Sequence, residues 1–290
     1  MAARTTQDRL SISQVSELLG IPVPTIRSWE RRYDFPSPAR TEGKHRRYSP
    51  EEIDRLRSLR DEITKGHPAR KAVELVRSGG REIARTEFLD RFTDAAHALD
   101  VEGVRRSLDQ AVEMIGVERA IVEVAIPGMR ELGDQWQSGR CDVATEHAAT
   151  GVVRQWFARL SAATPPPFRS RPLVLATAPT ELHTIGLEAF AVLLGRRGWP
   201  IRTLGALTPT DALVAALVSS RATGAIVTAQ RSVGRRGAIE SLRAADRITG
   251  LDLFYAGNAF STPRSRDGVP GTYLGTDLVA AAELVGSVTR

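Results

Sequence analysis

The spacing of apolar residues along the chain predicts three stretches of different architecture. Up to residue 80, short apolar runs are broken by Gly and Pro, as in a small domain of short helices. From residue 81 to about 160, apolar residues recur at intervals of three and four, which predicts amphipathic helices. Beyond residue 172, continuous apolar runs alternate with helical patterns. We therefore predict three domains, at residues 1–80, 81–163 and 164–290.

The first stretch predicts two short helices joined by a turn. Ser13 is the expected N-cap of the first helix, and Gly20 is expected to end it in a left-handed conformation. Pro22 and Pro24 suit the turn and the start of a second helix, which runs to Tyr33. This pattern predicts a helix-turn-helix, whose second helix enters the major groove of DNA.

A β-hairpin is predicted at residues 41–48, after a proline-rich break. Its turn is expected near Gly43, and such a wing places Lys44, Arg46 and Arg47 beside a duplex. Ser49 is the expected cap of a third helix, which begins with a proline and two acids.

The remaining stretches predict a four-helix bundle and a doubly wound sheet. The bundle helices are expected at about 88–99, 104–115, 117–137 and 141–162. After the stiff proline linker at 164–168, strands are expected at 173–177, 201–204, 225–228, 251–257 and 272–274, each followed or preceded by a helix. Strands and helices that alternate in this way predict a parallel α/β sheet, with ligands at the carboxyl ends of the strands.

The composition of the 290-residue chain excludes several classes of protein. Hydrophobic residues make up 42% and charged residues 26%, which is typical of a globular chain and not of a disordered one. The single cysteine, Cys141, excludes a disulfide framework and a cysteine-rich zinc module. No apolar run approaches the ~18 residues needed to cross a bilayer, and Met1–Arg9 has no apolar signal segment. We therefore expect a cytoplasmic protein without a membrane partner.

The net charge of +6 is distributed unevenly. Residues 1–80 carry 16 bases and 11 acids, residues 81–170 carry 11 and 14, and residues 171–290 carry 13 and 9. Within the first block, the segment from Arg27 to Tyr48 holds seven bases and interleaved aromatic residues. On charge alone, this cluster fits a phosphate backbone and a solvated face equally well.

The segments Thr25–Tyr33 and Arg40–Ser49 resemble the winged helix of MerR-type transcription regulators. The resemblance spans about residues 10–77 and implies binding to double-stranded operator DNA. It leaves Trp29 in the core. Phosphate contacts position a protein without reading sequence. The candidate contacts, mostly to phosphates, are Thr25, Arg27, Arg31, Arg46, Arg47 and Tyr48.

A Trp-x9-Glu-His motif in the predicted bundle is formed by Trp136, Glu146 and His147, with Gly139 and Asp142 marking a turn between helices. Packing alone would make Trp136 a core aromatic and His147 an interior histidine. The spacing is similar to that of the CarH/LitR-type photoreceptors, a group of MerR-type regulators. The resemblance implies that these three residues cover the upper face of a bound cobalamin, where the adenosyl group lies. An aromatic plane with polar partners suits a nucleoside in a dry pocket.

A second motif, Glu181-x-His183-x-x-Gly186, lies in the first predicted strand-to-helix turn. Imidazole Nε2 can ligate a metal while a carboxylate holds the other ring nitrogen. The motif resembles that of cobalamin-binding domains, which implies that His183 is the lower axial cobalt ligand. The same resemblance places Thr228 at a strand end, and Gly257 and Asn258 beside the nucleotide tail of the cobalamin. Gln230 and Ala256 depart from the family pattern.

The resemblance as a whole implies an adenosylcobalamin-dependent repressor, or one that uses another cobalamin, that forms dimers or tetramers and responds to light. Gln137 stands where the light-sensing relatives carry a second histidine that binds cobalt after illumination, which predicts a different illuminated state. The alternatives are a light-indifferent cobalamin sensor, a MerR-like regulator that has lost cobalamin, and a corrinoid-binding enzyme subunit. The chain has no stretch left for a substrate domain, and we therefore expect a regulator without enzymatic activity.

Overall fold

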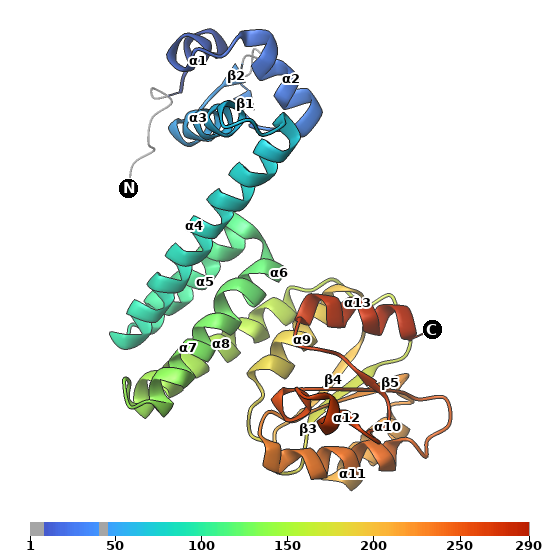
Figure 1. Ribbon diagram of the computed structural model, residues 1–290. Coiled ribbons are helices and arrows are strands. Elements are labelled where there is room, and N and C mark those ends of the chain that lie inside the picture. The colour runs from blue at the N-terminus through green and yellow to red at the C-terminus, as the bar shows by residue number, and fades with distance from the viewer. Residues whose placement is uncertain (1–8, 41–45, 290) are drawn as a thin grey trace. The chain divides into compact units, whose positions relative to one another are not determined.

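The computed structural model describes residues 9–40 and 46–289, and the side chains in these ranges except those of residues 40 and 79–84. Two compact units divide the chain, residues 1–86 and residues 87–290 (Figure 1). We call the first unit the head; the second contains a helical bundle and a parallel sheet. The predicted wing turn near Gly43, with Lys44, lies outside the described residues.

The head consists of short helices and a two-stranded hairpin. In chain order these are α1 (Ile12–Leu19), α2 (Val23–Tyr33), β1 (Ala39–Arg40), β2 (Arg46–Arg47), α3 (Pro50–Thr64) and the first part of α4 (Ala69–His97). The two strands pair antiparallel, as the predicted wing requires. The head therefore has the predicted winged helix-turn-helix fold.

The ends of the head helices follow from local capping. Ser11, and not the predicted Ser13, caps α1, because it forms a capping box with Gln14, while Ser13 lies inside the helix. Gly20 ends α1 in the left-handed conformation, as predicted. Ser49 caps α3 and forms a capping box with Glu52. The predicted start of α3 is thus confirmed, and the predicted cap of α1 was wrong by two residues.

The head has its own apolar core, in which α1, α2 and α3 meet the first turns of α4. Trp29 lies in this core and is only 8% exposed, in agreement with the expectation that it packs inside the head. The largest side chains that are fully buried here are Tyr48, Ile26, Leu56 and Leu59. The burial of an aromatic and three aliphatic side chains gives this small unit a stable scaffold for its exposed arginines.

Helix α4 runs without interruption through the predicted domain boundary at residue 80. Its first part contributes Ala72 and Val73 to the head core, and its last part buries Phe88, Phe92 and Ala96 in the bundle. Gly79 and Gly80 lie within the helix, although each glycine costs about 1 kcal/mol relative to alanine there. A single helix therefore belongs to both units.

The bundle consists of the last part of α4 and three further helical stretches, as predicted. These are α5 (Val101–Ile115), a continuous stretch formed by α6 (Val117–Ala120), η2 (Ile121–Ala125) and α7 (Ile126–Gln137), and α8 (Val143–Ala162). The η2 turn is a π-helix that leads into Pro127. A widened turn is suited to this place because proline cannot donate a hydrogen bond and its ring crowds the carbonyl four residues earlier. Gly128 lies against the Phe92 ring, where a Cβ would come within 2.6 Å.

The rest of the second unit is a five-stranded sheet in which every pairing is parallel. The strands are β3 (Leu173–Thr177), β4 (Ile201–Gly205), β5 (Gly224–Thr228), β6 (Asp252–Ala256) and β7 (Thr272–Tyr273), in the spatial order β4-β3-β5-β6-β7. The connecting helices are α9 (Ile185–Arg196), α10 (Thr210–Ser219), η3 (Ser232–Gly234), α11 (Arg235–Ala245), η4 (Asn258–Phe260), α12 (Pro263–Arg266) and α13 (Leu278–Val288). The strand order reverses between β3 and β5, so the loops after these two strands flank the switch point, where open α/β sheets bind ligands.

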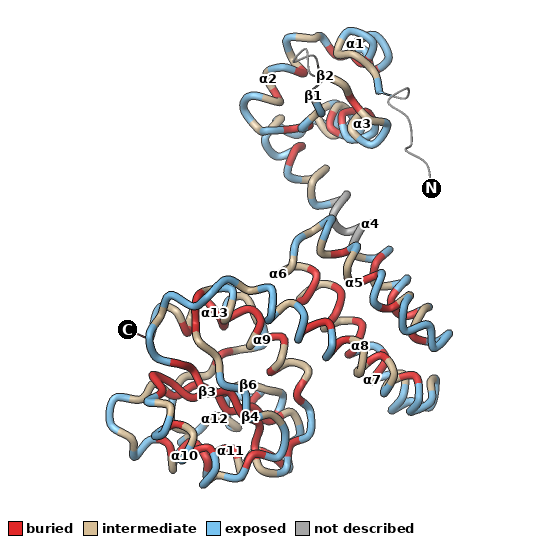
Figure 2. Tube along the Cα trace, turned by 180° about the vertical axis from the view of Figure 1, so that it is seen from behind, coloured by how far each residue is buried: buried red, intermediate tan, exposed pale blue. Residues whose placement is uncertain are grey.

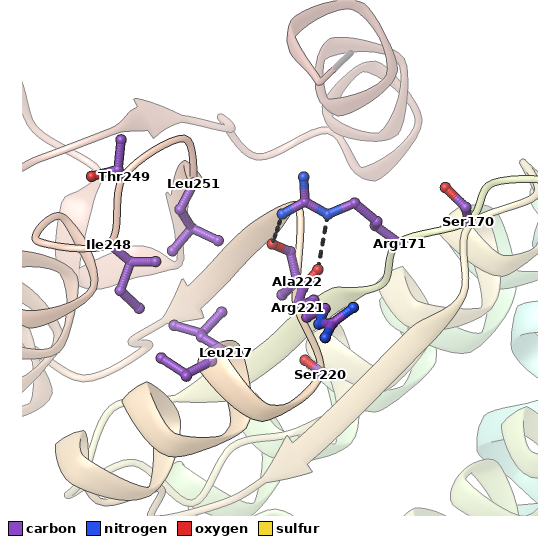
Figure 3. Close-up of a pocket in the computed structure, with 10 residues that line it drawn as sticks. Ser170, Arg171, Leu217, Ser220, Arg221, Ala222, Ile248, Thr249 and Leu251 are labelled. Atoms are coloured by element: carbon purple, nitrogen blue, oxygen red, sulfur yellow. Dashed lines mark hydrogen bonds between the residues drawn. The ribbon is translucent and has the colours of Figure 1, made fainter.

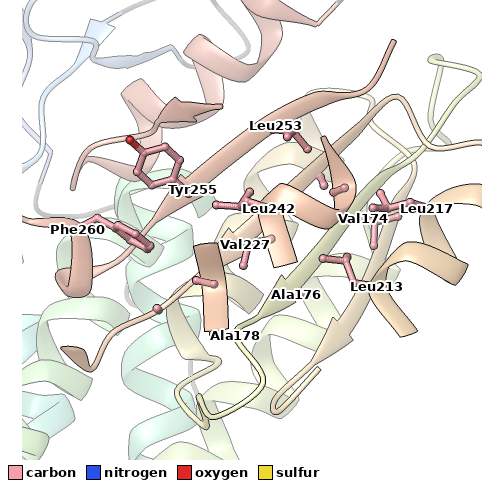
Figure 4. Packing of buried hydrophobic residues seen from close by; sticks show 14 of the residues in the cluster. Val174, Ala176, Ala178, Leu213, Leu217, Val227, Leu242, Leu253, Tyr255 and Phe260 are labelled. Carbon is pink, nitrogen blue, oxygen red and sulfur yellow. The ribbon is translucent and has the colours of Figure 1, made fainter. Parts of the chain in front are cut away.

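The sheet core lies between the strands and helices α10 and α11 (Figure 4). Val174, Ala176, Val227 and Leu242 are completely buried in it. All five residues of β3 and of β5 are buried, and β3 is drawn in the colour of buried residues in Figure 2. Central strands that are covered on both faces have continuous apolar sequences, which is why the sequence predicted β3 and β5. Within the described residues, no helix is both long and apolar enough to cross a membrane.

Candidate functional site

Glu181, in the loop between β3 and α9, connects the two loops that flank the switch point. Its side chain is completely buried. Oε1 accepts a hydrogen bond from the backbone N–H of His183 at 3.0 Å and also bonds Nδ1 of the His183 ring. Oε2 accepts from the backbone N–H groups of Gln230 at 2.7 Å and Arg231 at 2.9 Å, in the loop after β5. One carboxylate therefore determines the geometry of both loops.

The charge of Glu181 is stabilised where it lies. Burial by itself raises the pKa of this carboxyl, but the backbone donors of Arg231, His183 and Gln230 and the His183 ring together hold the pKa below its ordinary value. An ionised carboxylate accepts a proton donor, so the His183 ring carries its hydrogen on Nδ1. Nε2 is then a lone-pair donor, on a side chain that is 59% exposed. This is the arrangement that a single axial metal ligand needs.

Thr228 lies at the carboxyl end of β5 with a polar atom that no described residue satisfies. The residue is buried, and within the described chain its Oγ1 has no hydrogen-bond partner. A buried hydroxyl without a partner costs free energy, and such a group calls for an explanation. A ligand with a hydrogen-bonding group beside β5 would provide that partner. Thr228 therefore fits the position that the cobalamin resemblance assigned to it.

Gly257 is required by a close approach of the backbone. Its φ is +107°, and a Cβ would lie 2.2 Å from the carbonyl oxygen of Ala229. Asn258 follows with its backbone N–H bound to Oε1 of Gln230 at 3.2 Å, and its side chain is exposed. Gly186 differs, because a Cβ there would meet only Gln230 Nε2, at 3.9 Å. Protein packing thus explains why residue 257 is a glycine, whereas the role of Gly186 stays a prediction from the resemblance.

Trp136, Glu146 and His147 lie on either side of the turn between α7 and α8. Gly139 has a φ of +71°, and Asp142 caps α8 by accepting the Thr145 N–H at 2.8 Å, which confirms the predicted turn. Trp136 is 49% exposed and the His147 side chain 73% exposed. The interpretation of these two residues as interior packing is therefore wrong, since neither ring is in the core.

Of Trp136, Glu146 and His147, Glu146 has its carboxylate held by two hydrogen bonds. One of its carboxylate oxygens bonds His147 Nδ1 at 2.9 Å, and the other accepts the Thr150 hydroxyl at 2.8 Å. The carboxylate thereby orients the imidazole, whose Nε2 is directed away from Glu146. An exposed indole and an oriented imidazole offer a flat apolar surface and a polar contact, which suit a nucleoside.

The predicted DNA contacts of the head fall into two groups. Arg27 and Arg31 are exposed and one helical turn apart on α2, so they share a face, and Thr25 is partly exposed on the same helix. Arg47 is partly exposed on β2. These four residues are accessible to a duplex, and their contacts with DNA stay predictions.

Tyr48 was wrongly predicted to contact DNA. Its side chain is completely buried, and its hydroxyl donates a hydrogen bond to Glu30 of α2. Burial, and then the bond to Glu30, raise the pKa of this hydroxyl far above its ordinary value. Arg46 also bonds Glu30, with Nε 2.6 Å from Oε2. Glu30 therefore holds the wing strand against α2, and a DNA contact by Arg46 stays a prediction beside this structural role.

A cavity of about 580 Å³ lies at the other end of the sheet (Figure 3). Its lining comes from the end of α10 and from the segments that precede β3, β5 and β6: Ser170, Arg171, Leu217, Val218, Ser220, Arg221, Ala222, Ile248, Thr249 and Leu251. The Arg171 guanidinium donates to the carbonyls of Arg221 and Ala222 at 2.9 and 3.0 Å. The cavity therefore lies at the amino ends of the strands. There the Arg171 guanidinium bonds two carbonyls of the turn that precedes β5. The cavity is separate from the Glu181–His183 site at the carboxyl ends.

Comparison with protein families assigns two segments of the chain to known families. The family described as MerR HTH family regulatory protein matches residues 10–78, and the family described as B12 binding domain matches residues 88–161. The second match covers the helical bundle, including Trp136, Glu146 and His147. The fold and the site thus define a MerR-type regulator that carries a B12-binding domain.

Relatives that align over about three quarters of the chain make the assignment more specific. The chain is 36% identical over 217 residues to the HTH-type transcriptional repressor CarA of Myxococcus xanthus, which is 73% of each chain. It is 30% identical over 236 residues to the HTH-type transcriptional repressor CarH of the same organism, covering 76% of this chain and 77% of the relative. The chain therefore belongs to the CarA/CarH group of MerR-type regulators, and the predicted family is confirmed.

A solved structure supports the fold of the second unit. The monomethylamine corrinoid protein of Methanosarcina barkeri superposes with a TM-score of 0.55 at 15% identity, covering 70% of this chain and 99% of that chain. At this identity the likeness concerns the fold alone. It confirms the predicted combination of a helical bundle with an α/β sheet.

Proposed function

We propose that this protein is a transcription repressor that binds operator DNA through α2 and the wing and is controlled by adenosylcobalamin. The observation that carries the proposal is the Glu181-anchored His183, with Nε2 available at the switch point of the sheet. His183 would hold the cobalt from below, and Trp136, Glu146 and His147 would cover the adenosyl group from above. The unpartnered Thr228 hydroxyl would hydrogen-bond the nucleotide tail.

Each residue of the site has a role that its contacts support. Glu181 keeps the hydrogen of His183 on Nδ1, and Glu146 orients His147. The exposed Trp136 indole would supply an apolar plane that shields one side of the bound adenosyl group from water. When bound, adenosylcobalamin supplies a cobalt–carbon bond that light can break. Multivalent binding by several heads in a dimer or tetramer would then turn the bound state into tight DNA binding.

The direct test is retention of the ligand and its effect on assembly. Protein mixed with adenosylcobalamin in the dark should remain pink through desalting, whereas a colourless eluate contradicts the proposal. Its size and its affinity for operator DNA should then be measured before and after illumination. Loss of assembly and of DNA binding on illumination supports a light-responsive repressor.

Gln137 favours a second candidate, a cobalamin sensor that is indifferent to light. Glutamine is a poor cobalt ligand beside imidazole, so a photoproduct with two axial histidines needs a residue that this position lacks. Equal DNA affinity in dark and light with cobalamin present supports this candidate. A bis-imidazole spectrum after illumination contradicts the inference from Gln137.

Thr228→Val is expected to raise the Kd for adenosylcobalamin about tenfold, the effect of losing one hydrogen bond. The stability of the ligand-free protein should not fall, because the hydroxyl has no partner within the described chain. Absorbance titration and urea unfolding measure the two effects. Thr228→Ser keeps the hydroxyl and serves as the control. An unchanged Kd in Thr228→Val would show that the ligand does not use this group.

Arg27→Ala is expected to weaken binding to all DNA sequences to a similar degree. If Arg27 contacts one phosphate, the slope of log K against log salt should decrease by about one. DNA-binding titrations at several salt concentrations measure this slope. Arg105→Ala removes the same charge from the bundle, where Arg105 pairs with Glu102, and should leave the slope unchanged. A wild-type slope in Arg27→Ala would exclude the phosphate contact.

A further inference from the structure

Helix α9 is fastened to the bundle by an ion pair near each of its ends. In its first turn, one carboxylate oxygen of Glu188 accepts a hydrogen bond from Nε of Arg154 at 3.0 Å and lies 2.9 Å from a terminal nitrogen of the same guanidinium. At its C-terminal end, Arg197 pairs with Glu118 of α6 at 2.9 Å. Helices α8 and α9 also pack against each other. The helix that follows the His183 loop therefore has a defined position on the bundle.

The Arg154–Glu188 pair connects the two halves of the proposed ligand site. Glu188 is five residues beyond His183, and its backbone N–H bonds the carbonyl of Thr184 at 2.8 Å, directly after the loop. Arg154 is seven residues beyond His147 on α8, so the two lie on the same face of that helix. The Arg154–Glu188 pair thus connects α8, which carries Glu146 and His147, with α9, which begins just after His183.

The burial of Glu188 gives this pair more weight than a surface ion pair. The Glu188 side chain is 19% exposed and that of Arg154 is 53% exposed. Two donors of one guanidinium converge on one carboxylate oxygen, which restricts the geometry more than a single contact does. Removal of Arg154 would leave a mostly buried carboxylate without this partner. The pair therefore opposes a separation of α8 from α9.

We propose that Arg154 and Glu188 are positioning residues that set the spacing between His183 and the Trp136, Glu146 and His147 surface. By this spacing they determine which corrinoids the protein prefers. The proposal rests on the proposed function, since it assumes that a cobalamin lies between these two sets of residues. A cobalamin with a large upper group touches both sets, whereas one with a small upper group depends mainly on the lower set. Only the cobalamin with the large upper group gains affinity from a spacing that is fixed before binding.

The experiment compares adenosylcobalamin with methylcobalamin, whose upper group is small, in the dark and with the full chain. Arg154→Gln is expected to raise the Kd of adenosylcobalamin about fivefold, the upper range for a partly exposed ion pair, and that of methylcobalamin less than about twofold. Glu188→Gln should do the same. The double variant should be no worse than either single variant, because the two residues act through one contact.

Arg119→Gln is the matched control. It breaks the Arg119–Glu123 pair, which has a length of 2.7 Å and is also partly exposed but lies within one helical stretch of the bundle. It should leave the ratio of the two Kd values unchanged. In the ligand-free protein, hydrogen exchange of the first turn of α9 should increase in Arg154→Gln and not in the control. This measurement reports how firmly the first turn of α9 is held against the bundle in the absence of a ligand.

The possible failures can be told apart. If the wild-type protein binds neither corrinoid, the proposed function fails and this proposal fails with it. If the wild-type protein binds both and Arg154→Gln leaves the Kd ratio unchanged, only the positioning role is overturned. Additive effects in the double variant would also overturn it, because they would show that the two residues act separately.

Discussion

Replacing His183 with alanine is expected to abolish the retention of adenosylcobalamin through desalting. The Kd should rise at least about 100-fold, because even the partners that orient a metal ligand contribute 10- to 100-fold to affinity. The exposed imidazole presents the lone pair of its Nε2 to solvent, since Glu181 occupies its Nδ1. Absorbance titration in the dark measures the Kd, and the spectrum reports the lower axial ligand.

A loss of folding would not explain this result, because the His183 side chain is 59% exposed. Thermal unfolding of the ligand-free variant should match that of the wild-type protein. His97→Ala, at the exposed end of α4, is the control for removal of a surface histidine. A variant that lacks His183 and still binds with wild-type affinity and an unchanged spectrum would refute the assignment of the lower ligand.

Glu181→Gln should lower both the stability of the second unit and the affinity for the ligand. At neutral pH the variant loses a buried carboxylate that accepts three backbone N–H groups, for which we expect a decrease of about 2 kcal/mol in the free energy of unfolding. The affinity for cobalamin should fall about tenfold or more, because His183 loses the group that orients it. Urea unfolding and absorbance titration measure the two effects.

The pH dependence of stability distinguishes a charged from a neutral role of Glu181. The pKa of this carboxyl is below its ordinary value of 4.5 in the folded protein, so its ionised form stabilises the fold. This contribution is fully present above that ordinary value and is lost as the pH falls through the lower, folded-state pKa. The stability difference between wild type and Glu181→Gln should therefore narrow as the pH falls below about 4.5.

The control for this experiment is Glu240→Gln. Glu240 is exposed on α11, where it pairs with Arg236. Its replacement should change stability by less than about 0.5 kcal/mol at any pH. If Glu181→Gln and Glu240→Gln had equal effects, the buried carboxylate would not organise the two loops.

The elements were predictable from the sequence where local patterns determine them. Continuous apolar runs predicted β3 and β5, because strands covered on both faces contain few polar residues. Gly20 and Ser49 marked helix ends through local hydrogen bonds and backbone conformation. The motif around His183 was recognisable because its residues are adjacent in the chain, and the carboxylate does hold the imidazole as expected.

Other features escaped prediction because they depend on residues far apart in the chain. Tyr48 looked like a DNA contact within a basic segment, but it is buried against Glu30, which is 18 residues away. The continuity of α4 through Gly79-Gly80 runs against local propensity and is compatible with packing on both sides of that point. The contact of Arg154 with Glu188 spans 34 residues and leaves no local signal.

The sequence by itself determined the order of the three folds, the family and the candidate residues for binding cobalt and phosphate. These depend on periodicity, on short motifs and on side-chain chemistry, all of which are local properties of the chain. Only the tertiary structure decided which of those side chains are accessible and which are held in place. It buried Tyr48, left Trp136 exposed, and joined Glu181 to the loop after β5. The physical reason is that burial and hydrogen bonding depend on which distant segments pack together, and the chain order alone does not specify that packing.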